Sequence, residues 1–425
     1  MPGHTTSYYA ATRNNTSVRA SLHGDITADA CIIGAGFTGI SAALTLAERG
    51  YKPVVLEGEL VGFGASGRNG GQMINGYSRE LDELQRRYGR DEAQGLAAMA
   101  MEGADIIRER VAKYQIKCDL VPGAVMTAFS RRQMRGLEHT RKVWAEFGHQ
   151  EFEMIDREGL RGIVASDRYA GGLLDRKGGH IHPLNLVQGE AEAAESLGAV
   201  IYENSRVIAV ERGDTVTVRT NRGSVRAKHV LVCGNAYIGD LLRRDIGSKM
   251  MAVSSQVLTT EILDPDFCAS LLPANYCIED SNYFLDYFRR TADNRMLYGG
   301  GTVYGGSDPA SIEGKLRPLM EKTFPQLKGR KIEFSWSGNF ALTVPRVPHV
   351  GRIGGNILFS HGDSGHGVTT THLLGRLLGE AITNQIERFD VFAKLPYFPF
   401  PGGKNFRIPL TVLGSWYYRL LDRLG

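Results

Sequence analysis

The fold is decided at residues 32–39, which read Ile32-Ile33-Gly34-Ala35-Gly36-Phe37-Thr38-Gly39. The apolar run 30–33 at its start is typical of a buried parallel strand. After it, apolar residues recur at the spacing of one helix face. Residues 54–56 then predict a second strand, which ends at Glu57. A strand, GxGxxG, a helix, a strand and an acid at these distances predict a dinucleotide site, with the pyrophosphate at the helix N-terminus.

Two features narrow the choice of dinucleotide. Glu57 can accept the hydroxyl protons of an adenosine ribose and would repel a 2′-phosphate, which disfavours NADP but leaves NAD and FAD open. A second glycine-rich loop follows at once, Gly62-Phe63-Gly64-Ala65-Ser66-Gly67-Arg68-Asn69-Gly70-Gly71-Gln72. Ser66 and Asn69 can donate to phosphate or ribityl oxygens, and Arg68 can neutralise negative charge. The alternative is a flexible surface loop. So many potential ligand donors directly after the first motif favour the longer cofactor, FAD.

The two loops together resemble the flavin amine oxidases of the D-amino-acid oxidase and glycine/sarcosine oxidase superfamily. Three later segments are similar to that superfamily in the expected order: residues 179–186 with the strand at Val207, residues 229–237, and the last glycine loop at 362–369. A helix is expected from Thr370 to about Ile386, with its N-terminus towards the flavin. The resemblance implies that FAD is held by Gly34, Gly36, Phe37, Thr38, Glu57, Gly64, Ala65, Ser66, Arg68, Asn69, Gly70, Gly71, Gln72, Val207, Cys233, Gly234, Asn235, Gly362, Gly365, His366, Gly367, Val368 and Thr369.

Further segments resemble the gamma-glutamylputrescine oxidases within that superfamily. They are residues 7–10, 287–289, 297–301, 336–340 and 400–404, with Trp416-Tyr417-Tyr418 and Asp422 in the tail. The resemblance implies oxidation of the primary amine of gamma-glutamylputrescine to gamma-glutamyl-gamma-aminobutyraldehyde, with release of ammonia and hydrogen peroxide, in putrescine breakdown. One alternative is a related oxidase or dehydrogenase for glycine, sarcosine or a D-amino acid. Another is a non-catalytic FAD-binding partner protein.

Four residues are candidates for catalysis. His366, in the last glycine loop, can polarise the flavin or accept the amine proton, and Tyr287 and Trp336 can wall the path of the amine. Arg289 can hold the glutamyl carboxylate through two parallel hydrogen bonds, and Arg346, between Pro345 and Pro348, is a further basic candidate. Each also has a plain structural alternative, as a core side chain or one half of an ion pair.

Two departures from the superfamily concern the flavin and its electron acceptor. Some relatives tether the flavin through a Cys before the last glycine loop, but residues 338–352 contain none, so noncovalent FAD is expected. Some relatives carry a Lys near the flavin that promotes reaction with oxygen, and residues 295–299 contain none, which leaves oxygen or another acceptor open. The tail has Leu410, Leu413, Tyr417, Leu420 and Leu424 on one helical face. This face can contact a membrane and a quinone, although docking on the protein's own surface is favoured.

Composition sets the remaining limits. The chain of 425 residues is long enough for two domains, and its net charge of +4 is too small to argue for nucleic acid. Five cysteines without CxxC spacing indicate a reducing compartment and no metal site. Residues 1–21 are polar and no run of eighteen apolar residues exists, so neither a signal peptide nor a spanning helix is expected. These limits favour a cytoplasmic protein, and the resemblance implies an enzyme that acts on a small amine.

The expected fold class is α/β, with a Rossmann-like FAD-binding domain of the glutathione-reductase type interleaved with an α+β substrate domain built on a mixed or antiparallel sheet, as in D-amino-acid oxidase. The expected FAD-binding segments are 25–80, 155–250 and 336–390. The expected substrate segments are 81–154 and 251–335, and 391–425 form a C-terminal tail. Residues 81–115 are expected to form a helix, 120–129 a strand, 131–147 a helix and 251–262 a strand.

Overall fold

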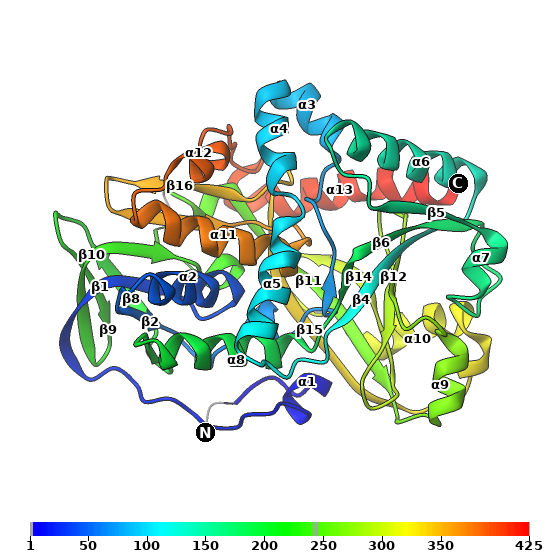
Figure 1. Ribbon diagram of the computed structural model, residues 1–425, viewed down its shortest axis with the longest axis horizontal. Coiled ribbons are helices and arrows are strands. Elements are labelled where there is room, and N and C mark those ends of the chain that lie inside the picture. The colour runs from blue at the N-terminus through cyan, green and yellow to red at the C-terminus, as the bar shows by residue number, and fades with distance from the viewer. Residues whose placement is uncertain (1–2, 240, 243–244, 425) are drawn as a thin grey trace.

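The computed structural model describes residues 3–239, 241–242 and 245–424, without the side chains of 404 and 417–424. Two sheets lie side by side, each covered by helices (Figure 1). Residues 3–23 pass along the lower edge and include the short helix α1 (Tyr8–Ala11). The predicted fold class, an α/β dinucleotide fold interleaved with a second sheet, is confirmed.

The first sheet contains the dinucleotide motif. Its strands run in the order β16–β17–β10–β1–β2–β7, and β7, β2, β1, β10 and β17 are parallel. The bounds are β1 Gly24–Ile33, β2 Pro53–Leu56, β7 Val200–Tyr202, β10 Gly223–Val232, β16 His349–Ile353 and β17 Ile357–His361. The antiparallel strands β8 (Val207–Glu211) and β9 (Val216–Thr220) continue from β10. The carboxyl ends of β1 and β2 lie together, as a dinucleotide site at the end of parallel strands requires.

Three helices cover one face of this sheet, α2 (Phe37–Glu48), α8 (Pro183–Ser196) and α11 (Gly367–Ile382), and α5 (Glu102–Lys113) packs against α2 and α11. They lie next to one another in Figure 1, in blue, cyan, green and orange. Ile40, Leu44 and Leu377 are fully buried in the core they share. The opposite face is packed with apolar residues that include Cys31, Val54 and Val218. Strands buried on both faces explain the unbroken apolar run before the glycine motif.

The second sheet has nine strands in the order β15–β11–β14–β13–β12–β4–β6–β3, with β5 paired to β6. The bounds are β3 Gln72–Met73, β4 Val121–Ala128, β5 Phe152–Asp156, β6 Gly171–His180, β11 Met250–Thr260, β12 Cys277–Asp280, β13 Tyr287–Arg290, β14 Met296–Tyr304 and β15 Ile332–Thr343. Helices α9 (Pro265–Leu271) and α10 (Ile312–Thr323) close the core on its outer face, while α6 (Arg131–Glu146) and α7 (Arg157–Arg161) pack beside β5 and β6. The other face looks towards the dinucleotide motif.

Most predicted elements are confirmed, with two differences. The single helix expected over residues 81–115 is three helices, α3 (Leu81–Tyr88), α4 (Arg90–Met99) and α5. Gly89, with a φ of +97°, separates α3 from α4, and residues 100–101 separate α4 from α5. Strands β6 and β15 lie in the nine-stranded sheet, although the segments containing them were assigned mainly to the FAD-binding domain. The domain boundaries themselves stay a prediction.

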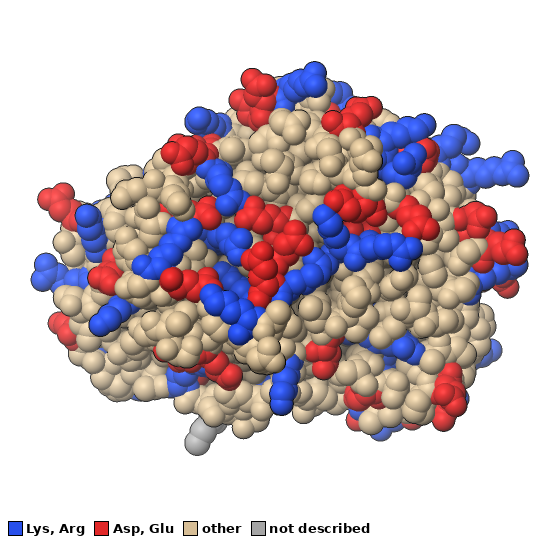
Figure 2. All heavy atoms as spheres, viewed as in Figure 1, with Lys and Arg blue, Asp and Glu red and all other residues tan. Residues whose placement is uncertain are grey.

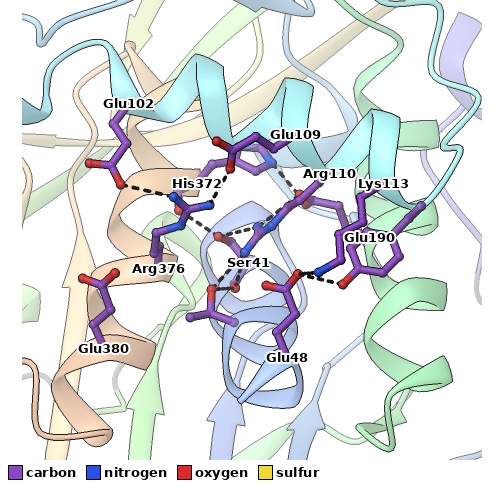
Figure 3. Close-up of polar contacts among 12 residues, drawn as sticks. Ser41, Glu48, Glu102, Glu109, Arg110, Lys113, Glu190, His372, Arg376 and Glu380 are labelled. Atoms are coloured by element: carbon purple, nitrogen blue, oxygen red, sulfur yellow. Dashed lines mark hydrogen bonds and ion pairs between the residues drawn. The ribbon is translucent and has the colours of Figure 1, made fainter. Parts of the chain in front are cut away.

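A buried charged cluster ties the dinucleotide helix to its neighbours (Figure 3). The guanidinium of Arg110 on α5 donates to the Ser41 hydroxyl at 2.8 Å and contacts Glu190 of α8 at 3.2 Å. Glu190 in turn lies 3.1 Å from Nε2 of His372 on α11. Burial alone favours the neutral acid, but the charges of His372 and Arg110 outweigh it and hold the pKa of Glu190 below its usual value. The cluster therefore locks the positions of α2 and α11, whose N-termini both reach the site described below.

The C-terminal segment contains α12 (Glu387–Ala393) and α13 (Gly403–Leu424). Leu410 and Leu413 of the expected apolar face are 46% and 55% exposed, whereas the side chains of Tyr417, Leu420 and Leu424 lie outside the described residues. None of the described helices combines the length and apolar character needed to cross a bilayer. On the face shown in Figure 2, Lys and Arg are interspersed with Asp and Glu rather than gathered in a patch of one sign.

Candidate active site

A cavity of about 800 Å³ lies between the two sheets. Residues from both glycine loops, from the ends of β1, β2 and β10 and from the inner face of the nine-stranded sheet line it. The structure brings together in its lining every residue predicted to hold FAD except Gly71, Gly362 and Thr369. Each of these three is next in sequence to a residue that does line the cavity.

The first glycine loop is hydrogen-bonded to the second glycine loop and to Glu57. The backbone N–H of Phe37, at the start of α2, donates to Oγ of Ser66 in the second loop at 2.9 Å. The carboxylate of Glu57 accepts the backbone N–H groups of Ala35 and Glu59 at 2.7 and 2.9 Å. Burial raises the pKa of Glu57, and the two N–H groups oppose that rise. Ser66 keeps its own proton for donation to a phosphate, and the start of α2 faces the cavity.

The second loop is shaped by one of its own side chains. Asn69 donates to the carbonyls of Ala65 and Ser66 at 3.0 and 3.1 Å and accepts the N–H of Gly71 at 2.8 Å. Both amide hydrogens are therefore used inside the loop, so Asn69 fits a shaping role better than the expected donation to a ligand. Arg68 also lines the cavity, with its guanidinium 4.4 Å above the ring of Phe63.

The last glycine loop is tied to the turn after β10. Asn235 donates to Asp363 at 2.7 Å and accepts the N–H of Gly362 at 2.9 Å, so these two cofactor segments hold each other. His366 follows, directly before α11. Burial lowers the pKa of His366 to about 4, which makes the ring neutral near pH 7. Its Nδ1 atom is buried and has no hydrogen-bond partner among the described residues.

This lining fits a flavin dinucleotide. The N-termini of α2 and α11 both reach the cavity, where the backbone N–H groups of a first helical turn can bind anionic or polar oxygens. The carboxylate of Glu57 lies at the end of β2, where the ribose of a dinucleotide belongs. The Nδ1 atom of His366, which has no hydrogen-bond partner among the described residues, lies in the last glycine loop, where a ligand atom can form a hydrogen bond with it.

Arg289 and Trp336 do not line the cavity but lie behind the second loop. All five N–H donors of Arg289 have acceptors, which are Tyr9, His180 and the carbonyls of Gly70, Ile181 and Arg290. A guanidinium so fully used, and only 3% exposed, does not fit the expected role as the carboxylate ligand. Trp336 donates from Nε1 to the carbonyl of Arg68 at 2.8 Å. Both are positioning residues for the loop.

Tyr287 and Arg346 do line the cavity, as expected of candidates for substrate contact. The ring of Tyr287 packs on the second loop so closely that a Cβ atom on Gly70 would lie 2.4 Å from its Cε2. Burial raises the pKa of Tyr287 to about 12, so its hydroxyl stays protonated. Arg346 adopts a left-handed backbone with a φ of +62° in the turn after β15.

Glu279 is one of several polar side chains in the lining that sequence reasoning missed. Glu279 on β12 is 6% exposed and lies at the cavity. Burial raises the pKa of Glu279 to about 7. The available signal was the pair of acids that ends the otherwise apolar strand Cys277-Ile278-Glu279-Asp280. The loop after that strand also contributes Tyr283, Phe284 and Leu285 to the lining.

Known proteins share this architecture and much of the sequence. The family described as FAD dependent oxidoreductase (DAO) matches residues 29–381. The gamma-glutamylputrescine oxidoreductase of Escherichia coli is 51% identical over 425 residues, with full coverage of both chains. A probable oxidoreductase, OrdL, of Haemophilus influenzae is 40% identical, over 99% of this chain and 98% of that protein. The glycine oxidase structure from Geobacillus kaustophilus superposes with a TM-score of 0.69 at 20% identity, covering 86% of this chain and 96% of that one.

The comparisons and the geometry of the cavity both indicate FAD as the cofactor. An FAD-bound L-alpha-glycerophosphate oxidase from Mycoplasma pneumoniae also shares the fold, with a TM-score of 0.67 at 15% identity over 88% of this chain and 97% of that one. The glycine loops, the acid at the end of β2 and the match over most of the chain lead to one conclusion: this protein is an FAD-dependent oxidoreductase of the DAO family.

Proposed function

We propose that this enzyme oxidises the primary amine of gamma-glutamylputrescine to gamma-glutamyl-gamma-aminobutyraldehyde, with release of ammonia. The observation that carries the proposal is the 51% identity over the full length to the gamma-glutamylputrescine oxidoreductase of E. coli. When bound, FAD supplies the two-electron oxidant, while the protein supplies binding, orientation and electrostatics. We further propose that FAD is held noncovalently, that oxygen takes up the electrons as hydrogen peroxide, and that the enzyme is cytoplasmic.

The cavity supports a substrate with charges at both ends. The amine to be oxidised needs an acidic or polar surface, and Glu279, Tyr287 and Ser255 provide one on the nine-stranded sheet. The glutamyl end carries a carboxylate, for which an arginine is the natural partner. Because Arg289 is used elsewhere, we propose Arg346 for this role, since it lines the cavity in the turn after β15. We propose His366 and Tyr287 as residues that contact the reacting groups.

The test is anaerobic bleaching of the flavin absorbance in the purified holoenzyme. Gamma-glutamylputrescine is compared with free putrescine, sarcosine, glycine and a D-amino acid, and oxygen is then admitted. We expect fast bleaching by the glutamylated amine alone, followed by reoxidation and peroxide release. Bleaching that oxygen fails to reverse would replace oxygen by another acceptor, such as a quinone.

Two outcomes would reject the proposed substrate. Preferential bleaching by sarcosine, glycine or a D-amino acid would assign the enzyme to a different amine. Failure of every amine to bleach the flavin would favour a non-catalytic FAD-binding protein. A matched control is Glu153→Gln, which changes a carboxylate of β5 that is 55% exposed and pairs with Arg176 at 2.7 Å, away from the cavity.

A further inference from the structure

Glu279 occupies a central place in the nine-stranded sheet. Strand β12 lies between β4 and β13, and Glu279 is opposite Met126 on one side and Tyr287 on the other. Residues directly opposite each other in a ladder have side chains on the same face, with Cβ atoms about 5 Å apart. The carboxylate of Glu279 therefore shares the inner face of the sheet with Tyr287, and both line the cavity.

That position is next to the cofactor loop. The ring of Tyr287 is in direct contact with Gly70 of the second glycine loop. Gln72, at the end of the same loop, donates to the carbonyl of Ile278, the residue before Glu279, at 3.0 Å. Two contacts thus join the strand that carries Glu279 to the loop that borders the cofactor. Glu279 lies where the cofactor side of the cavity meets the substrate side.

The described residues of the lining include four carboxylates, and three of them have partners. Glu57 accepts two backbone N–H groups, Glu59 pairs with Arg206 at 2.6 Å, and Asp363 accepts from Asn235 and Gly365. Glu279 differs from these. No side-chain hydrogen bond or ion pair of its carboxylate is found within residues 3–239, 241–242 and 245–424.

A buried carboxylate without a partner is costly in a folded protein, which makes such a group a candidate for function. The groups around it identify the missing partner. Met126 is apolar and Tyr287 is a neutral hydroxyl, while the guanidinium of Arg289, two residues further along β13, donates to carbonyls behind the loop. Arg68, Arg79, Arg206 and Arg346 also line the cavity, but burial is the one cause of the raised pKa of Glu279, with no charged side chain of the described residues contributing. A cation that completes the site would therefore come from the ligand.

We propose that Glu279 binds the ammonium group of the amine substrate and accepts its proton before oxidation. This inference rests on the proposed amine oxidation. An alkyl ammonium has a pKa near 10, so only about one molecule in a thousand is neutral at pH 7. The charged nitrogen has no lone pair to assist removal of hydride from the adjacent carbon. A nearby acceptor is therefore required.

The transfer is balanced within the pair. One N–H bond of the ammonium breaks, its electron pair stays on nitrogen, and one O–H bond forms on the carboxylate. The products are a neutral amine and a neutral carboxylic acid, and neither partner is oxidised or reduced. Because burial penalises both charges of the starting ion pair, the protein interior favours this neutral pair more than water does. The raised pKa of Glu279 has the same origin.

The first test uses Glu279→Gln, which keeps the shape of the side chain and removes both the charge and the basic oxygen. The anaerobic rate of flavin bleaching is measured against pH for wild type, Glu279→Gln and the control Glu153→Gln. We expect the bleaching rate of Glu279→Gln to be about 10²- to 10⁴-fold lower than that of wild type at neutral pH. The acid limb of the wild-type profile, which is the fall in rate at low pH, should also disappear in Glu279→Gln. The control should keep the wild-type profile. Equal rates for Glu279→Gln and wild type at every pH would overturn the proposal.

A second measurement does not depend on turnover. The probe is a gamma-glutamylputrescine analogue with two methyl groups in place of the hydrogens on the carbon next to the terminal nitrogen. It keeps the ammonium but cannot give up hydride, and its binding is measured by calorimetry. Wild type should bind it more tightly as the pH rises through about 7, and Glu279→Gln should bind it at least tenfold more weakly with no such rise. Unchanged affinity in Glu279→Gln would contradict the assignment.

Failure of this inference can be separated from failure of the proposed substrate. If wild type is bleached by glycine or sarcosine instead, the substrate assignment fails, and the same variants are compared with that amine. If Glu279→Gln does not retain FAD, Glu279→Asp provides a second variant, which keeps the base but withdraws it by one methylene. We expect an intermediate rate with the acid limb preserved, and a wild-type rate from a variant with a displaced base would refute the role.

Discussion

The buried cluster in Figure 3 leads to a prediction about the free energy of unfolding. Glu190 is fully buried between the guanidinium of Arg110 at 3.2 Å and the imidazole of His372 at 3.1 Å. Both ring nitrogens of His372 lie within hydrogen-bond distance of an oxygen, one on Glu190 and one on the backbone of Val368. Glu190→Gln would leave the buried guanidinium of Arg110 without its counter-charge. Breaking a buried pair in this way typically costs about 3–5 kcal/mol.

The expected change in melting temperature follows from the chain length. An unfolding entropy of about 2.1 cal/mol/K per residue over 425 residues corresponds to about 0.9 kcal/mol/K, so Glu190→Gln should lower Tm by about 3–6 °C. The matched control is Glu48→Gln on α2, which breaks the exposed pair with Lys113 in the same view. That pair is worth less than about 1 kcal/mol, or about 1 °C.

The assay is thermal unfolding of the apoprotein followed by circular dichroism across a range of pH. Because the pKa of Glu190 is below its usual value of 4.5, its contribution is present above that pH and is lost as the pH falls through the folded value. The gap between Glu190→Gln and wild type should therefore narrow in acid. Equal shifts for Glu190→Gln and Glu48→Gln at neutral pH would refute the view that the buried cluster holds the helices together.

Four other changes test the site. Arg289→Lys cannot replace five directed donors, so we expect weaker FAD binding, measured by fluorescence titration of the apoprotein, with unchanged preference among amines. Gly71→Ala should abolish FAD retention in the purified protein, because φ is +75° there and a Cβ atom would lie 2.3 Å from the carbonyl oxygen of Ile181. Arg346→Met should raise KM for gamma-glutamylputrescine while leaving KM for free putrescine unchanged, since putrescine has no carboxylate. The free energy of unfolding of apo Glu279→Gln, measured in urea, should rise by up to about 3 kcal/mol relative to wild type between about pH 4.5 and 7. This is the interval between the usual and the folded pKa of Glu279. A difference that does not change with pH would contradict this.

The parts of the site that sequence reasoning found are those whose chemistry is local. Glu57 follows the first glycine motif by one helix and one short strand, and the structure places its carboxylate on the N–H of Ala35. The second loop was recognised by its density of glycines and donors, and all of its residues from Gly64 to Gly70 except Gly67 line the cavity. Composition and spacing suffice when a motif folds onto itself or onto its sequence neighbour.

The direction of a strand residue was harder to predict. Tyr287 and Arg289 were both expected on the substrate side, and as residues two apart they share a face of β13. The second loop crosses this face and separates them, because Tyr287 packs on Gly70 at the edge of the cavity, whereas Arg289 bonds to the loop from behind. A segment more than two hundred residues earlier thus determines which of the two side chains reaches the cavity. Sequence spacing alone does not predict that contact.

Glu279 was missed for the same reason, and its case shows how function is built from the register of the sheet. Its polar neighbour Tyr287 arrives through antiparallel pairing, and Met126, from a segment about 150 residues earlier, through parallel pairing. A shift of one residue in either ladder would turn the carboxylate of Glu279 into the outer core, where Phe288 and Tyr298 pack. The sheet tolerates an unpaired buried acid because its folding energy comes from the apolar residues on that outer side. The cost of the acid is then recovered only when a cationic substrate enters the cavity, which links the stability of this strand to the chemistry we propose for it.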